Sequence, residues 1–169
     1  RKETGSSVAS NTDIIAVPSA RDYINSNKSN ADVINSCSIP AGDGGDATYY
    51  CNGDLTLGGG SYSNVTIMAS GDITHNGASS LGASVQLTIA LISGGKVTIN
   101  GSNDTYGVFW AEGNVRQNGS SMLGGSVVAG GDVDRNGKFN YTQVKGLSPN
   151  LNLPKGGPKV VQWAEKRAI

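Results

Sequence analysis

The chain has few of the side chains that catalysis and metal binding require. Its 169 residues include one histidine and two cysteines, and charged residues make up 15%, where about a quarter is usual. A single histidine and two cysteines give neither a zinc constellation nor a Ser-His-Asp arrangement. We therefore predict a protein that is not an enzyme, with no catalytic residues, metal or cofactor. No apolar run of about 18 residues is present, so no segment of this sequence is expected to span a membrane.

Glycine, in contrast, is abundant and recurs at a fixed period. Five segments carry a glycine, an aliphatic residue two places later and a second glycine six places after the first. Their first glycines are 18, 24, 18 and 18 residues apart, at Gly53, Gly71, Gly95, Gly113 and Gly131. A period near twenty is typical of stacked coils, each of which buries its apolar side against its neighbours.

The residues around each glycine alternate between apolar and polar. Side chains of an extended chain point alternately to opposite sides, so one parity faces inward. The sequence therefore predicts an all-β fold, a β-solenoid of about 18 residues per coil, with three short strands around a triangular section. The inward rows are Tyr49, Ile67, Leu91, Phe109 and Val127; Cys51, Ala69, Ser93, Ala111 and Ala129; and Leu55, Ile73, Val97, Val115 and Val133.

An Asn-Gly pair marks the same corner in four coils. Asn and Gly tolerate the backbone that a sharp corner needs, and asparagines stacked at one corner can hydrogen-bond along the column. We expect such a ladder through Asn76, Asn100, Asn118 and Asn136. The 24-residue interval holds six extra residues within Gly82 to Leu91, which we interpret as an added strand or an outward loop.

One outward row is apolar where the other outward rows are polar. An apolar stripe five residues long requires a cover, and the sequence leaves three candidates for it. These are a short N-terminal helix near Ser19 to Ile24 with Ser19 as N-cap, a closing strand with Trp163, and another subunit. The row consists of Tyr50, Met68, Ile92, Trp110 and Val128.

The histidine and the cysteines have separate interpretations. His75 falls in a row with Leu57 and Ile99 beside the corner, so we expect a partly buried corner residue and not a catalyst or ligand. Cys37 and Cys51 lie 14 residues apart, and we predict a disulfide between them, with two free thiols as the alternative. A disulfide indicates an exported protein.

Charge is divided unevenly along a chain whose net charge is zero. Residues 1–134 hold six Lys and Arg against twelve Asp and Glu, a balance of −6, and residues 135–169 hold seven against one, a balance of +6. Such a basic end is either a solvated tail or a contact for an acidic subunit, a phosphate polymer or an anionic lipid. The candidates for polyanion binding are Lys138, Lys145, Lys155 and Lys159.

These patterns divide the chain into three parts. Residues 1–46 are expected to form an N-terminal cap and linker with the short helix. Residues 47–145 are expected to form the solenoid, and residues 146–169, with three prolines, an exit segment and closing strand.

Two of the repeats resemble a known family. The segments FWAEGNVRQNG (109–119) and VVAGGDVDRNG (127–137), with the ending PKVVQWAE (158–165), are similar to the solenoid ectodomains of PilX-type, type IV pilus-associated proteins. The resemblance implies a right-handed β-helix in a minor pilin, with other pilin subunits as partners and in some cases adhesion or DNA uptake. It also implies a membrane helix before Arg1 and a place at the cell surface.

The sequence therefore favours an exported, non-enzymatic structural or interaction domain of a minor pilin or related surface fibre, which contacts DNA or a surface glycan. One alternative is an end-to-end polymer like the bactofilins, whose repeat is similar. Another is a carbohydrate-binding β-helix with Trp110 and Tyr62 as sugar platforms.

Overall fold

The computed structural model describes residues 18–77, 80–84, 86–119, 122–137 and 140–142. These residues form two parallel sheets, an α-helix α1 (Ala20–Asn27) and a 3-10 helix η1 (Lys28–Asn30). Sheet A has the order β1-β2-β4-β6-β8-β10-β12, and sheet B has the order β11-β9-β7-β5-β3. The strands of sheet A are β1 (Asp32–Val33), β2 (Gly42–Cys51), β4 (Tyr62–Ala69), β6 (Ile89–Ser93), β8 (Thr105–Ala111), β10 (Met122–Ala129) and β12 (Asn140–Thr142). Those of sheet B are β3 (Leu55–Gly58), β5 (Ile73–Asn76), β7 (Val97–Asn100), β9 (Val115–Asn118) and β11 (Val133–Asn136).

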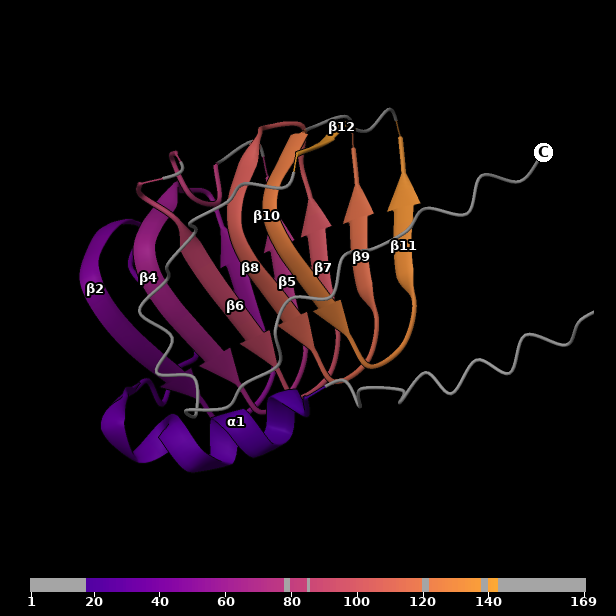
Figure 1. Cartoon of the computed structure of the whole chain (residues 1–169). Helices are drawn as coiled ribbons and strands as arrows, with labels where there is room; N and C mark the ends of the chain where they lie inside the picture. Colours follow the sequence, from indigo (N-terminus) through magenta and orange to yellow (C-terminus); the bar gives the residue numbers. More distant parts are fainter. Residues whose placement is uncertain (1–17, 78–79, 85, 120–121, 138–139, 143–169) are drawn as a thin grey trace, which may run out of the picture.

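The two sheets form opposite walls of one solenoid, and each coil contributes a strand to both, so the predicted β-solenoid is confirmed. In Figure 1 the strands of sheet A run downward in front and those of sheet B run upward behind, while successive coils advance from left to right. A chain that descends in front, ascends behind and advances to the right follows a right-handed path. Each coil contributes two strands and not the expected three, because the long strands of sheet A curve continuously (Figure 1) where we had expected a corner between two short strands.

Strand pairing follows the period of the sequence. Leu55 pairs with Ile73, and the same row continues through Val97 and Val115 to Val133. Side chains of the inward rows form the core between the sheets, with Ile67, Leu91 and Phe109 fully buried. The prediction of inside and outside from parity is therefore confirmed, and each coil buries its apolar face against the next.

In the 24-residue interval, the described residues 82–84 and 86–88 lie in a loop. Leu81 stays in register, bridged to Tyr62 in the preceding coil and to Thr105 in the following coil. The regular ladder resumes at Ile89, which pairs with Val65 and Gly107. The insertion therefore lies between Leu81 and Ile89, as the outward-loop interpretation predicted.

The corner at the end of each sheet B strand depends on glycine. Gly119 has φ +116°, and a Cβ there would overlap the carbonyl of Gly101 in the preceding coil. Only a residue without a side chain allows both this backbone and this approach. The Asn-Gly pairs therefore set the spacing of the coils as well as turning the chain.

The first coil is closed at its outer end. Sheet A begins with β1, whose Asp32 and Val33 pair with β2. The sheet thus starts before residue 47, where we had expected the solenoid to begin. The following segment, residues 34–41, places Ile39 in the core and packs Ile34 and Cys37 against it. The apolar interior is thus covered where the solenoid starts.

Candidate functional site

The apolar outward row lies beneath helix α1. Ala20, Tyr23 and Ile24 of the helix form a second apolar cluster with the row, in which Tyr50, Met68, Ile92 and Trp110 are buried and Val128 is partly buried. The Tyr23 and Trp110 rings lie 5.2 Å apart, and the Trp110 indole Nε1 donates to the Pro18 carbonyl at 3.1 Å. The structure therefore places an internal cover on this face, and the row from Tyr50 to Trp110 is not exposed to a second subunit.

Polar contacts tie the start of the helix to the coils beneath it. Ser19 caps the helix by accepting from the Asp22 amide at 3.2 Å, as predicted, and its hydroxyl donates to Glu112 Oε2 at 2.9 Å. The Arg21 amide donates to the same Glu112 oxygen at 3.2 Å, and Arg21 Nε donates to the Gly94 carbonyl at 2.9 Å. We call α1 with these contacts the helix strap.

Glu112 lies where a helix favours negative charge. The first amides of a helix have no partner within the helix and carry partial positive charge. The hydrogen bond from the Arg21 amide, with that from Ser19, lowers the pKa of Glu112. The carboxylate thus stays charged and stabilises the partial positive charge at the start of the strap.

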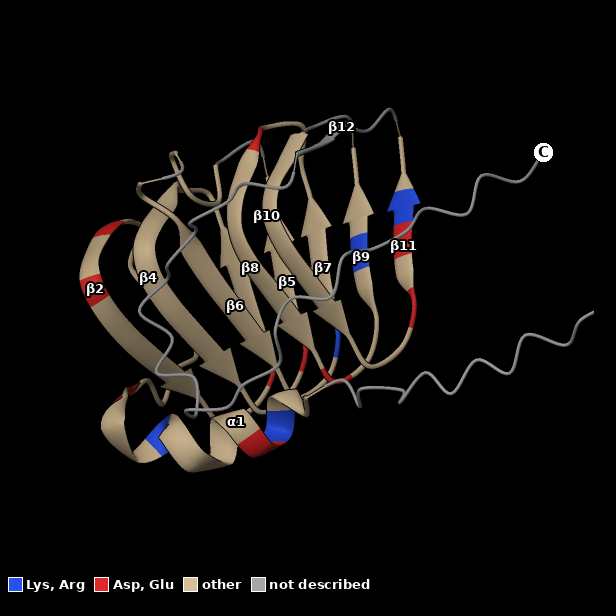
Figure 2. Ribbon diagram, viewed as in Figure 1, with Lys and Arg blue, Asp and Glu red and all other residues tan. Residues whose placement is uncertain are grey.

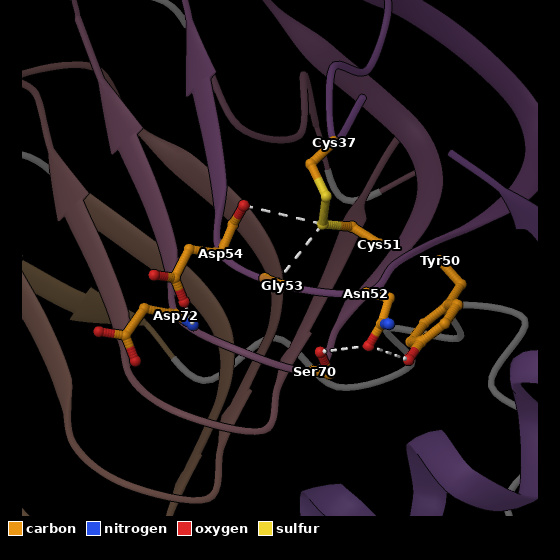
Figure 3. The surroundings of a disulfide bond; sticks show 8 residues. All are labelled: Cys37, Tyr50, Cys51, Asn52, Gly53, Asp54, Ser70 and Asp72. Carbon is orange, nitrogen blue, oxygen red and sulfur yellow. Dashed lines mark hydrogen bonds between the residues drawn. A yellow bond between two sulfur atoms is a disulfide. The ribbon is translucent and has the colours of Figure 1, made fainter. Parts of the chain in front are cut away.

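The disulfide lies at the first coil of the solenoid. Cys37 and Cys51 are bonded with their Cα atoms 5.1 Å apart, which confirms the predicted pairing. Figure 3 shows Cys51 Sγ near the carbonyl oxygens of Gly53 and Asp54, at 3.6 and 3.7 Å. These are packing contacts, since a disulfide sulfur has no proton to donate. The bridge joins the segment that covers the core to the first strand of the solenoid.

Hydrogen bonds between neighbouring coils line the turns from sheet A to sheet B, where acidic residues recur (Figure 2). Asp54 Oδ1 accepts from the Asp72 amide at 2.8 Å, and Asp72 Oδ1 accepts from the Lys96 amide at 2.8 Å. Asn114 Oδ1 accepts from the Asp132 amide at 3.0 Å. These side chains cap the next coil and are not paired as an acid and a base.

The asparagine ladder is present at the opposite corner. Asn100 Nδ2 donates to Asn76 Oδ1 at 2.8 Å, Asn118 Nδ2 donates to Asn100 Oδ1 at 2.7 Å, and Asn136 Nδ2 donates to Asn118 Oδ1 at 2.9 Å. Each side chain therefore links its coil to the preceding one. The sequence prediction of this ladder is confirmed.

His75 is more buried than the sequence indicated. It pairs in register with Leu57 and Ile99 inside the core and is 1% exposed, where we expected a partly buried corner residue. Burial lowers its pKa below the ordinary value, because an imidazolium would lose its hydration. A side chain enclosed in this way has no access to a substrate.

The expectation of aromatic sugar platforms is wrong. Trp110 is buried under the helix strap, and Tyr62 is 4% exposed with its hydroxyl donating to the Gly58 carbonyl at 3.1 Å. A sugar ring stacks on an exposed aromatic face, and neither residue offers one. Both rings stabilise the solenoid instead.

The predicted basic site lies outside the described residues. This applies to Lys138, Lys145, Lys155 and Lys159, and also to the closing strand with Trp163. Within the described ranges, no group of three His, Cys, Asp or Glu side chains is arranged to hold a metal ion. No helix there is long and apolar enough to cross a membrane.

Sequence reasoning missed the anchor made by Glu112, Arg21 and Gly94. The Ser19–Glu112 contact joins residues 93 apart, and no local pattern marks such a pair. The N-cap at Ser19 was the available signal, and it located the helix but not the coil to which the helix attaches.

Comparisons with protein-family models, curated proteins and solved structures found no match to this chain.

Proposed function

We propose that this chain is the rigid structural and interaction domain of an exported surface-fibre subunit, of the kind that its resemblance to pilus-associated ectodomains implies. The proposal rests on two covers of the apolar surface. Residues 34–41, with the Cys37–Cys51 bridge, cover the first coil, and the helix strap covers the apolar outward row along the side of the coils. An exported subunit must stay folded outside the cell without the help of chaperones, and both features stabilise the fold.

The disulfide supports the exported setting. Disulfides persist in oxidising compartments and are rare where cytosolic thiols keep cysteines reduced. Cys51 is 1% exposed, and Cys37 packs against the core. A bridge in this position is suited to a structural role and not to a redox cycle, for which an accessible thiolate is needed.

The closed end also argues against the end-to-end polymer. A solenoid that stacks on copies of itself must present its interior at both ends. Here residues 34–41 cover the first coil with Ile39 in the core. The domain is therefore better suited to a discrete subunit, which contacts partners through its polar faces or its far end.

The test locates the protein and its cysteines in the native cell. Surface fibres are sheared off, and the remaining cells are fractionated. An alkylating reagent then reports whether Cys37 and Cys51 are bonded. We expect the chain in the fibre fraction with its disulfide formed. A cytoplasmic chain with two reduced thiols, or filaments grown from the purified chain alone, would contradict the proposal.

Contact with DNA is a second role for which the charge distribution speaks, since the balance of +6 lies in residues 135–169. Charge reversal of Lys138, Lys145, Lys155 and Lys159 together to Glu should abolish DNA retention at low salt. The control reverses Lys28 and Lys96, two exposed lysines elsewhere on the described surface, and so makes half the charge change of the fourfold variant. Retention that survives the fourfold change, or that the control lowers equally, would dismiss this role.

A further inference from the structure

We propose that Asn136 is a site of spontaneous deamidation, where the side-chain amide becomes a carboxylate without an enzyme. The chain carries five Asn-Gly pairs, and glycine has no Cβ to hinder its own backbone nitrogen as a nucleophile. The chemistry is available in principle at every pair. The structure indicates which pair is protected and which is not.

The reaction needs water and nothing else. The Gly137 backbone nitrogen attacks Cγ of Asn136, and the new C–N bond closes a five-membered imide. The Cγ–Nδ2 bond breaks, and Nδ2 leaves as ammonia with the proton from the Gly137 amide. Water then opens the ring at either carbonyl, which gives aspartate or its isomer linked through the side-chain carboxyl.

Three pairs of the asparagine ladder have their nucleophile engaged. The Gly77 amide donates to the Asn100 carbonyl at 3.2 Å, the Gly101 amide to the Asn118 carbonyl at 3.1 Å, and the Gly119 amide to the Asn136 carbonyl at 2.9 Å. Each bond runs to the next coil. The nitrogen cannot attack until that coil separates, and β5, β7 and β9 are each paired on both sides.

The fourth pair lies at the last strand of sheet B. β11 pairs with β9 on one side, and among the described residues no carbonyl accepts from the Gly137 amide. Asn136 and Gly137 are both exposed, whereas Asn100, Gly101, Asn118 and Gly119 are partly buried. An edge strand opens locally at lower cost than a strand held on two sides, so the reactive geometry is reached most readily here.

The fifth pair, Asn52-Gly53, provides a comparison at the closed end. Asn52 Oδ1 accepts from the Tyr50 hydroxyl at 3.3 Å and from the Ser70 hydroxyl at 3.1 Å (Figure 3). The preceding residue, Cys51, is fixed by the disulfide. Two hydrogen bonds thus hold the Asn52 side chain and the disulfide fixes the preceding residue, so we expect slower deamidation there than at Asn136.

Deamidation would remove the last rung of the ladder. A carboxylate at position 136 has no Nδ2 proton to donate to Asn118 Oδ1, a bond that is 2.9 Å long in the intact chain. It would also add a negative charge two residues from Asp134. The modification therefore loosens the final coil and changes the charge of the solenoid at that end.

The test measures deamidation at each pair by peptide mass mapping, in the intact, disulfide-bonded chain incubated in mildly alkaline buffer. The same chain unfolded in denaturant calibrates the intrinsic rates. In the folded chain Asn136 should react about tenfold or more faster than Asn100, because the Gly101 amide has its hydrogen bond to lose first. In denaturant the two rates should differ little.

The Asn136→Gln variant is the matched control, since a longer side chain would have to close a less favourable six-membered ring. It should show no product at position 136 and unchanged rates at the other pairs. Equal rates at Asn136 and Asn100 in the folded chain would overturn the proposal, and so would earlier reaction at Asn52 or Asn76.

Discussion

The two ends of the solenoid are built from the same repeat and have different surroundings. At the first coil, Leu55 of β3 is 1% exposed beneath the segment that Cys37 and Ile39 hold in place. At β11, Val133 occupies the same inward row and is 37% exposed. A repeat unit thus acquires its stability from its neighbours and not from its own sequence. Residues 34–41 and the disulfide take the place of a neighbour at the first coil.

The largest effect should come from opening the closed end. Replacement of both Cys37 and Cys51 by alanine should lower the free energy of unfolding by about 3 kcal/mol, because the bridge restricts the unfolded chain. Alanine fits the site, since Ala69 lies next to Cys51 in the row. Urea denaturation of the variant and of the oxidised chain measures the difference. An unchanged midpoint would show that the cap holds without its disulfide.

A matched pair of valines compares the middle with the far end. Val115 and Val133 are register partners, 2% and 37% exposed. Val115→Ala should cost about 2 kcal/mol because it leaves a cavity between packed coils. Val133→Ala should cost less than about 1 kcal/mol. Equal losses in denaturant unfolding would mean that Val133 is as well packed as Val115 in solution.

The asparagine ladder gives a second gradient toward that end. Asn118 donates to Asn100 and accepts from Asn136, whereas Asn136 donates one such bond. Each such hydrogen bond contributes roughly 1 kcal/mol to the free energy of unfolding. Asn118→Ala, which removes two, should therefore cost about 1 to 2 kcal/mol, and Asn136→Ala, which removes one, at most about 1 kcal/mol. Thermal unfolding of the two variants side by side tests this order, and the reverse order would contradict it.

The smallest effect is a dependence on pH. His75 is buried, which lowers its pKa below 6.5 in the folded chain, while the unfolded chain keeps the ordinary value. The unfolded state therefore binds the proton first, so the contribution of His75 to stability is present above pH 6.5 and is lost as pH falls below it. Unfolding free energies on both sides of pH 6.5 measure the slope. His75→Leu, which copies Leu57 of the same row, should remove this component, and a slope that persists in the variant has another origin.

Much of the fold was predictable because a solenoid repeats its contacts. The pairing of Leu55 with Ile73 and the Asn76–Asn100 rung both follow from aligning the glycines. Position within one period encodes the register, the inward side and the corner. The helix cap at Ser19 was equally local in origin.

The rest could not be predicted, because it depends on how distant parts of the chain meet. Trp110 donates to the carbonyl of Pro18, 92 residues away, and no periodicity records that contact. The same limitation misled the interpretation of Trp110 and Tyr62 as sugar platforms, since parity gives the side of a strand but not what covers it. The number of strands per coil depended on the curvature of sheet A, which the glycine period does not specify.

Hydrogen–deuterium exchange of backbone amides, resolved along the chain by mass spectrometry, tests the asymmetry most directly. β3 and β11 are the two edge strands of sheet B, and the covering segment 34–41 lies only at the first coil. Exchange should therefore be slow in β5 and β7, faster in β3 and fastest in β11. Exchange in β11 as slow as in β7 would contradict the account, as would a first coil that exchanges before the last.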